Sequence, residues 1–456
     1  MSDPNARRFT AHEERLAHSY ALLRDARDRA RKESKYDSAA TRQKMTEACK
    51  VKTGLTPRDE QLDIAECLLL GLDATLIAGT GWGKTLAFAL PSFVETRKVT
   101  IIISPLNVLE VDQAARFCSW DLPAIGLNGN TYTDSVHKEI AAGAYRFIIV
   151  GPELCVDADS RFRPLLSTPA FNKKVGAVIV DEAHCITQWG TGFRPKYADL
   201  DTLRALLRIR VSVLLASATM PPVSLAQARR TMHIDSDDSF HLNLGNDRAN
   251  ISWEVRHMQG GKRDLQSLQF IVPPDAAQLS RFPRTIVFFD DIFLSMRALR
   301  WFRAQVPEHL RARVQCYHAR RGQLGKDITF EEFRTGRVDI LFATESAGMG
   351  CDIPDIELTV QFMAPESLSI WFQRAGRAGR SADIQARAVL LIQPSVFHEK
   401  GKATRKAGEP IEYVKELEPG LRMWVAPPPG TCRRDVADEY FDNPRRRQGA
   451  YELEHL

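Results

Sequence analysis

The sequence predicts an α/β protein of two tandem domains, each built around a parallel sheet. From about Leu55 onward, short apolar runs alternate with helical stretches. The runs are continuously apolar, which is typical of strands buried on both faces, and strands separated by helices indicate right-handed βαβ units. The polar stretch 233–250 separates two sets of runs, so we expect the linker between the domains there.

Ten apolar runs are the expected strands. The first set occupies residues 74–79, 99–104, 145–151, 175–180 and 211–217. The second set occupies residues 284–289, 314–318, 338–344, 357–362 and 386–392. Because each set is long enough for a sheet of its own, the two sets predict two similar domains with a ligand cleft between them.

Four segments are expected along the chain. Residues 1–50 form a helical extension, with a charged helix over 10–31 whose apolar stripe is too thin and irregular for a sustained coiled coil. Residues 51–240 and 241–400 form the two α/β domains. Residues 401–456 form a C-terminal tail.

Composition excludes several classes of protein. Of the 456 residues, 44% are hydrophobic and 26% charged, which is ordinary for a globular chain. The 62 basic residues exceed the 57 acidic ones by only +5, so a polyanion would bind in a local groove rather than on a wholly basic face. We see no secretory signal and no membrane-spanning run, and expect a soluble intracellular protein, nuclear if eukaryotic and cytoplasmic if bacterial.

Residues 78–85, AGTGWGKT, lie between an expected strand and an expected helix and match a Walker A loop. Gly81 and Gly83 allow backbone N–H groups to surround phosphate oxygens in front of the positive helix N-terminus. Lys84 is expected to contact the β- and γ-phosphates, and Thr85 to bind Mg²⁺. The loop therefore predicts ATP with Mg²⁺ as the cofactor, whereas the alternative is a glycine-rich turn without a ligand.

A second candidate motif, Asp-Glu-Ala-His, follows the expected strand 175–180. A carboxylate at the carboxyl end of such a strand points into the ligand crevice of an α/β sheet. Asp181 suits Mg²⁺, and Glu182 suits a general base that orients the attacking water. The alternative is an exposed start of a helix.

The third motif is QRAGRAGR, residues 373–380. We expect Arg377 and Arg380 on one face of a helix start, where they stabilise charge on the transferring phosphoryl group if the second domain closes on the first. Gln373, which opens the motif, is grouped with them as a catalytic candidate. The alternative is a basic helix face in water.

These motifs, in this order and spacing, resemble a superfamily 2 helicase with two RecA-like domains and a nucleotide cleft between them. Residues 181–197, DEAHCITQWGTGFRPKY, resemble the Walker B motif and aromatic-rich loop of RecQ DNA helicases. The resemblance implies an ATP-dependent 3′-5′ DNA helicase that is stimulated by single-stranded DNA and acts on single-stranded and forked DNA. It leaves the oligomeric state open.

The same resemblance assigns the residues that couple DNA binding to ATP hydrolysis. In the aromatic-rich segment they are His184, Gln188, Trp189, Phe193 and Arg194. Aromatic rings stack on bases without reading their identity. The alternative is that Trp189 and Phe193 are buried anchors of the loop.

Three further motifs match the family. They assign adenine recognition to Arg58 and Gln61, the link between hydrolysis and domain movement to Ser217 and Thr219, and nucleotide contacts to Gly350 and Asp352.

The tail departs from the family. Residues 431–441 resemble the start of the four-cysteine zinc subdomain that follows the helicase core in RecQ proteins. Cys432 is the only cysteine downstream of the core, and one thiolate is too few for such a site, so we expect no zinc. This departure weakens the expectation of strand separation but leaves the expectation of ATP hydrolysis unchanged.

Two other functions remain open from the sequence. The first is an RNA helicase of the DEAD or DEAH kind, which shares the same motifs. The second is a nucleic-acid-binding ATPase with little unwinding activity.

Overall fold

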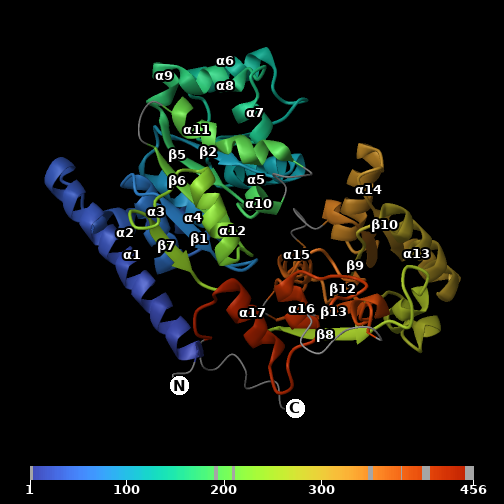
Figure 1. Ribbon diagram of the computed structural model, residues 1–456. Helices are drawn as coiled ribbons and strands as arrows, with labels where there is room; N and C mark the ends of the chain where they lie inside the picture. The colour runs from blue at the N-terminus through green and yellow to red at the C-terminus, as the bar shows by residue number, and fades with distance from the viewer. Residues whose placement is uncertain are drawn as a thin grey trace. The chain divides into compact units, whose positions relative to one another are not determined.

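The computed structural model describes residues 4–188, 194–207, 211–347, 353–381, 383–402 and 411–446 (Figure 1). These residues form two compact units. Unit 1 contains the chain up to Asn246 and again Tyr440–Arg446, whereas unit 2 contains Asp247–Glu439. The expected domain limits at residues 50, 240 and 400 stay predictions.

In the described part of unit 1, seven parallel strands form one sheet in the order β3-β4-β2-β5-β6-β1-β7. The strands are almost completely buried, because helices cover both faces of the sheet. Their bounds are β1 Ala74–Ile77, β2 Val99–Ile103, β3 Ala124–Leu127, β4 Phe147–Val150, β5 Val175–Val180, β6 Ser212–Ser217 and β7 Phe240–Asn243.

Helices α1 and α2 of unit 1 lie in the N-terminal part of the chain, well before the first strand β1. Helix α1 is long and highly charged and packs along the edge strand β7 (Figure 1). The α-helices are α1 Pro4–Ser34, α2 Ser38–Thr53, α3 Asp59–Leu69, α4 Lys84–Val94, α5 Asn107–Ser119, α6 Asp134–Ala142, α7 Pro152–Val156, α8 Phe162–Ser167, α9 Pro169–Asn172, α10 Cys185–Gln188, α11 Asp201–Leu206 and α12 Pro222–Thr231, with a 3₁₀-helix η1 at Pro195–Leu200.

Unit 2 repeats the parallel arrangement. Its described residues form a six-stranded sheet in the order β10-β11-β9-β12-β13-β8. The strands are β8 Ile251–His257, β9 Thr285–Phe288, β10 Val314–Tyr317, β11 Ile340–Ala343, β12 Leu358–Phe362 and β13 Ala386–Ile392. The α-helices are α13 Ile292–Gln305, α14 Gln323–Arg334, α15 Leu368–Ala375, α16 Pro419–Val425 and α17 Arg433–Phe441, and shorter 3₁₀-helices are η2 Leu265–Ile271, η3 Ala276–Gln278, η4 Glu308–Arg313, η5 Glu345–Ala347 and η6 Pro394–Val396. Across both units, no helix of the described residues combines the length and apolarity needed to cross a bilayer.

All ten predicted apolar runs contain a strand, which confirms the predicted fold class. The predicted linker 233–250 contains the boundary between the two units, after Asn246, but it also contains β7, which pairs in parallel with β1 and belongs to the first sheet. Strands β3, β7 and β8 were missed. Each is an edge strand of its sheet, and β8 carries the charged residues Glu254 and Arg256 at half-buried positions, so none of them shows a long apolar run.

Residues 440–446 complete unit 1 by contacting α1 and the end of β7. Arg8 Nη1 donates a hydrogen bond of 2.9 Å to the Asn443 carbonyl, and Arg15 pairs with Asp442 at 2.5 Å. The side-chain amide of Asn243 donates to the Asp442 carbonyl over 2.8 Å. The expected helix over residues 10–31 therefore exists in a longer form, and its N-terminal half is held by chain from the far end of the sequence.

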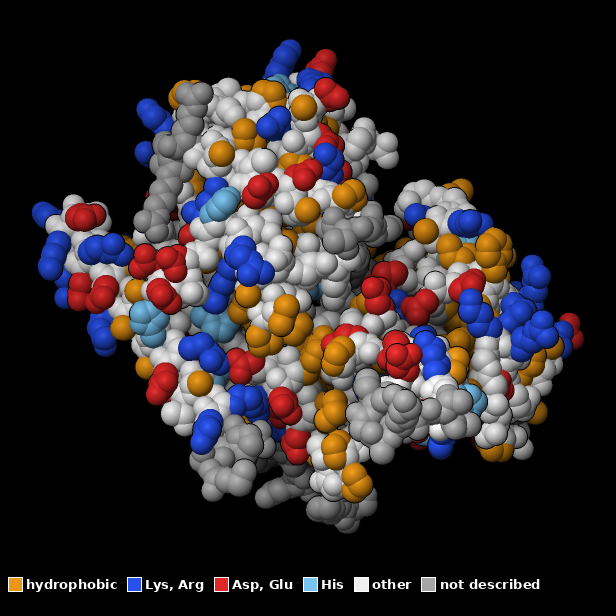
Figure 2. Space-filling model, in the orientation of Figure 1, with side chains coloured by type: hydrophobic (Ala, Val, Ile, Leu, Met, Phe, Trp, Pro, Cys, Tyr) orange, Lys and Arg blue, Asp and Glu red, His pale blue; other side chains and the backbone are white. Residues whose placement is uncertain are grey.

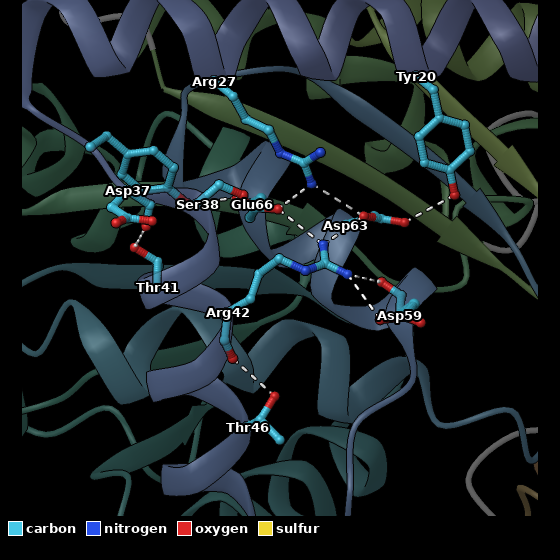
Figure 3. Close-up of polar contacts among 11 residues, drawn as sticks. Tyr20, Arg27, Asp37, Ser38, Thr41, Arg42, Thr46, Asp59, Asp63 and Glu66 are labelled. Carbon is cyan, nitrogen blue, oxygen red and sulfur yellow. Dashed lines mark hydrogen bonds and ion pairs between the residues drawn. The ribbon is translucent and has the colours of Figure 1, made fainter.

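A buried ion network fixes α1 and α2 onto α3 (Figure 3). The carboxylate of Glu66 on α3 has no exposed surface. It accepts hydrogen bonds from Arg27 of α1, from Arg42 of α2 at 3.0 Å, and from Ser38 and Tyr36 at 2.6 and 2.9 Å. One turn earlier on α3, Asp63 accepts from Tyr20 and Arg42, so two carboxylates and two guanidinium groups share the interface.

Hydrogen bonding determines the charge state of Glu66. Burial raises the pKa of Glu66, but hydrogen bonds from Arg27, Ser38 and Arg42 more than offset this effect, so its pKa lies below the usual value. A lowered carboxyl pKa stabilises the fold above the pKa of the unfolded chain. This contribution is lost as the pH falls through the lower pKa of the folded state.

Replacing Glu66 with Ala is expected to lower the free energy of unfolding by about 3–5 kcal/mol, because Arg27 and Arg42 then keep their charges without the buried carboxylate. Urea denaturation measures the change. Glu47→Ala is the matched control, since Glu47 is exposed on α2 and contacts only the nearby Gln43 in the hydrogen bonds of this helix. A loss for Glu66→Ala no larger than that of the control would contradict the role of the network.

Candidate active site

The carboxyl ends of three neighbouring strands bring the sequence motifs of unit 1 together. Strands β5, β6 and β1 pair in parallel and in register. Beyond their ends the pairing continues, because Ala78 N donates to Ser217 O over 3.0 Å and Ala183 N donates to Ala216 O over 2.9 Å. The Walker A loop, the Asp-Glu-Ala-His segment and the segment 217–219 therefore start side by side at the carboxyl ends of these three strands.

The Walker A loop has the backbone geometry that its glycines predict. Gly81 and Gly83 have φ angles of 88° and 97°, in the left-handed region that favours glycine. Helix α4 begins at Lys84, directly after Gly83, so Lys84 and Thr85 form its first turn. Lys84 Nζ donates to the Ala78 carbonyl of the same loop over 2.9 Å. A lysine, a glycine-lined loop and a helix N-terminus are the donors that fit a polyphosphate.

Helix α3 contributes the two residues expected to recognise the base. The side chain of Gln61 is buried and its Nε2 donates to the Gly83 carbonyl over 3.1 Å, while its Oε1 accepts from the Arg58 backbone at 2.9 Å. The Arg58 guanidinium lies 6.0 Å from the ring centroid of Trp82. Trp82 thus packs beside Arg58, and Gln61 contacts the phosphate loop itself.

The Walker B carboxylate is held by a residue that the sequence reasoning missed. Gln113 Nε2 of α5 donates to Asp181 Oδ2 over 2.6 Å, and Asp181 Oδ1 accepts from the Glu182 backbone at 3.0 Å. Burial raises the pKa of Asp181, and Glu182 raises it further, whereas Lys84 acts in the opposite direction. The only sequence signal for Gln113 is a polar residue on the inner side of a helix. A bound cation would favour the charged form of Asp181 further, which makes it a suitable Mg²⁺ ligand.

His184 links the Asp-Glu-Ala-His segment to the next strand. Its side chain is buried, and its Nδ1 lies 2.8 Å from Ser217 Oγ and 3.3 Å from Glu182 Oε2. Ser217 Oγ in turn accepts from the Thr219 backbone at 3.2 Å. His184 thus lies between the expected general base Glu182 and Ser217, one of the residues expected to join hydrolysis to movement.

Part of the aromatic-rich segment falls outside the described residues, and so do Trp189, Phe193, Gly350 and Asp352. Gln188 is the last residue of α10. Arg194 resumes the described chain, and its Nη1 lies 3.5 Å from Glu153 Oε2.

The arginine motif of unit 2 differs from its prediction. Helix α15 ends at Ala375, so Arg377 and Arg380 follow the helix instead of starting one. Gly376 caps the helix, and Gly379, between Arg377 and Arg380, has a φ of 58° in the left-handed region that favours glycine. Gln373 is buried inside α15. That Arg377 and Arg380 face the phosphate loop stays a prediction.

Arg374 is the second residue that the sequence reasoning missed. Its guanidinium is buried and pairs with Asp290 at 2.6 Å and Glu345 at 2.5 Å, and it donates to Gln361 at 2.6 Å. These contacts anchor the motif to β9 and β12 of the sheet. Its position beside two other arginines gave no signal for this structural role.

Two family descriptions match the chain and together cover more than half of it. DEAD/DEAH box helicase matches residues 58–228, and the helicase conserved C-terminal domain matches residues 268–382. The chain therefore carries a DEAD/DEAH box helicase domain followed by a helicase conserved C-terminal domain. The predicted superfamily is therefore confirmed.

Among curated relatives, this helicase is similar to RecQ proteins. It is 27% identical over 391 residues to the ATP-dependent DNA helicase RecQ of Pasteurella multocida, a match that covers 84% of this chain. The helicase spans 57% of the length of that relative.

Solved structures support the fold. MrfA, a DUF1998 helicase bound to DNA, matches with a TM-score of 0.59 at 16% identity, covering 77% of this helicase and 50% of that chain. Dbp5 of S. cerevisiae, bound to RNA and ADP BeF3, matches with a TM-score of 0.58 at 17% identity, covering 77% of this helicase and 87% of that chain. At such identities the likeness establishes only the fold, which is two RecA-like domains in tandem.

Gly83→Ala is expected to weaken ATP binding by about tenfold, a loss of about 1.4 kcal/mol. A Cβ at this position would lie 2.7 Å from Gln61 Nε2, and φ is 97°, so both Gln61 and the loop must shift. Titration with a fluorescent ATP analogue measures the effect. Gly54→Ala is the matched control, because Gly54 has a φ of 72° at the end of α2 with nothing within 4 Å of the added atom. Equal ATP affinity for the two variants would contradict the role of the Gln61 contact.

Proposed function

We propose that this helicase is an ATP-dependent 3′-5′ DNA helicase of the RecQ type, with an ATPase that single-stranded DNA stimulates and with forked DNA as its substrate. Two observations support the proposal. The Asp-Glu-Ala-His segment continues into an aromatic-rich sequence of the RecQ kind, and the curated relative from Pasteurella multocida is a RecQ DNA helicase.

The contact between His184 and Ser217 carries the mechanistic part of the proposal. The 2.8 Å contact between His184 Nδ1 and Ser217 Oγ joins the Asp-Glu-Ala-His segment to the segment 217–219, which is expected to link hydrolysis to domain movement. Mg²⁺ supplies charge neutralisation on the phosphates when ATP is bound. Lys84, Thr85 and Asp181 hold the phosphates and the ion.

Other residues of the chain have proposed roles in the same reaction. Glu182 orients and deprotonates the attacking water. Gln373, Arg377 and Arg380 stabilise charge on the phosphoryl group. Arg58 and Gln61 bind the base. Gly350 and Asp352 belong to the nucleotide contacts by resemblance.

DNA is proposed to bind through phosphates and stacking, with little sequence preference. On the face shown in Figure 2, basic and acidic side chains are interspersed over most of the surface. This distribution agrees with the small net charge of +5 and favours a local path for the strand. Trp189 and Phe193 supply stacking rings, while Gln188, Arg194 and Thr219 belong to the coupling set.

The proposal predicts ATP turnover that rises about tenfold or more with single-stranded DNA and rises less with RNA of matched sequence. A coupled ATPase assay measures both. Duplexes with a single-stranded tail at only one end test polarity, because a 3′-5′ enzyme unwinds only those with a 3′ tail. Stimulation by RNA alone would show an RNA helicase instead, and stimulation by DNA without unwinding would show a DNA-dependent ATPase.

Lys84→Ala is expected to reduce ATP turnover by about a hundredfold or more while DNA affinity changes by less than about threefold, because Lys84 contacts phosphates and not DNA. Fluorescence anisotropy with labelled DNA measures the affinity. Lys98→Ala is the control, since Lys98 is exposed and donates to the Lys173 carbonyl in the same unit. Retained turnover in Lys84→Ala would refute the phosphate-loop assignment.

A further inference from the structure

Helix α5 carries two buried polar side chains, Glu110 and Gln113, that lie near two different functional regions of unit 1. Glu110 and Gln113 lie three residues apart, so they are neighbours on one side of the helix. The contact of Gln113 with Asp181, described above, occupies the side toward the nucleotide site. Glu110 lies on the side toward Arg194, at the end of the aromatic-rich segment.

Three charged side chains converge over Gly151, directly before α7. A Cβ on Gly151 would lie 2.8 Å from Glu153 Oε2 and 3.5 Å from both Arg194 Nη1 and Glu110 Oε1. The absence of a side chain on Gly151 therefore leaves the space that these groups share. A larger residue would displace Glu153 first.

Glu110 is an unusual member of this cluster. Its side chain has no exposed surface, and within the described residues neither carboxylate oxygen has a hydrogen-bond partner. Such a group is costly to bury. An unpartnered buried carboxyl beside a guanidinium indicates a contact that forms in another state of the protein.

Arg194 is loosely held between two carboxylates. Its Nη1 is 3.5 Å from Glu153, which is an ion pair beyond hydrogen-bonding geometry, and this nitrogen has no hydrogen-bond partner in the described chain. Glu110 is the alternative partner. Arg194 thus has two possible partners, one on α7 and one on α5, which is the arrangement expected of a two-state element.

The charge of Glu110 depends on the same neighbours. Burial raises the pKa of Glu110 to about 8, with Glu153 raising it and Arg194 lowering it. Cys155 of α7 also faces the carboxyls, and burial keeps its thiol protonated by raising its pKa. Glu110 is therefore largely neutral near neutral pH and ionises when Arg194 approaches.

We propose that Glu110 and Gln113 are positioning residues through which α5 couples the position of Arg194 to the Walker B carboxylate Asp181. Pairing of Arg194 with Glu110 fixes α5 and so secures the hydrogen bond that Gln113 already donates to Asp181, which keeps this carboxylate in the orientation that binds Mg²⁺. The inference rests on the proposed DNA-stimulated ATPase for its biological purpose. The coupling itself is a property of unit 1 and can be measured without DNA.

A double-mutant cycle between Arg194→Ala and Gln113→Leu tests the coupling, because Arg194 and Gln113 share no hydrogen bond or ion pair of their own. The measured quantity is the Mg²⁺ concentration that gives half-maximal binding of a fluorescent ATP analogue to the full chain. Arg194→Ala is expected to raise this concentration about threefold in the parent and to leave it unchanged in the Gln113→Leu and Glu110→Gln backgrounds. Effects of Arg194→Ala that are equal in all three backgrounds overturn the proposal.

Two controls separate positioning from general damage to the fold. Arg194→Lys keeps the charge and is expected to restore most of the parent value, which a purely steric role of Arg194 would not allow. Val111→Ala alters an exposed residue of the same helix and is expected to change nothing. Glu110→Gln preserves the shape of the neutral acid, and thermal unfolding verifies that each variant is folded.

The pH profile gives a second readout. In the parent, Arg194→Ala should raise the half-maximal Mg²⁺ concentration more above about pH 8, where Glu110 is ionised, than at lower pH. In the Glu110→Gln background, the effect of Arg194→Ala on this concentration should not depend on pH. An identical profile in both backgrounds overturns the role of Glu110. If the parent ATPase is not stimulated by DNA, the proposed function fails, whereas the cycle still decides the coupling.

Discussion

In-register parallel pairing of β5, β6 and β1 is the constraint on which the active site depends. Because the strands end together, Ala78 of the phosphate loop bonds to the Ser217 carbonyl, and Ala183 of the Asp-Glu-Ala-His segment bonds to the Ala216 carbonyl. A slip of one residue would turn every side chain of a strand to the other face. The sheet therefore sets the geometry, and the side chains supply the chemistry.

Helix α3 extends this constraint to the N-terminal helices. Its first turn contacts the phosphate loop through Gln61, and its middle carries Asp63 and Glu66 in the buried ion network. Burying these charges requires that each has a partner, so α1 and α2 cannot shift independently of α3. Gln61 and the phosphate loop that it contacts are thus supported by the two helices that precede α3.

The sequence was sufficient for features with a local cause. Strands buried on both faces are visible as apolar runs, and the Walker A loop is visible because glycine, lysine and threonine are needed at fixed spacing. Features with a distant cause were missed. The partner of Gln113 lies 68 residues away, and the partners of Arg374 come from three other segments. Strand β7 is a strand only because β1 offers an open edge. The turn at Gly376 places Arg377 and Arg380 after a helix, although the sequence of residues 373–380 is also compatible with the start of a helix.

Unit 1 is discontinuous in the chain, and this has a consequence for its synthesis. Asp442 and Asn443, which contact α1 and the end of β7, emerge from the ribosome only after residues 247–439 of unit 2 have been made. Domains usually fold as units in the order of translation. Here the nascent first domain must wait, with the ends of α1 and β7 uncovered, until translation delivers its last segment.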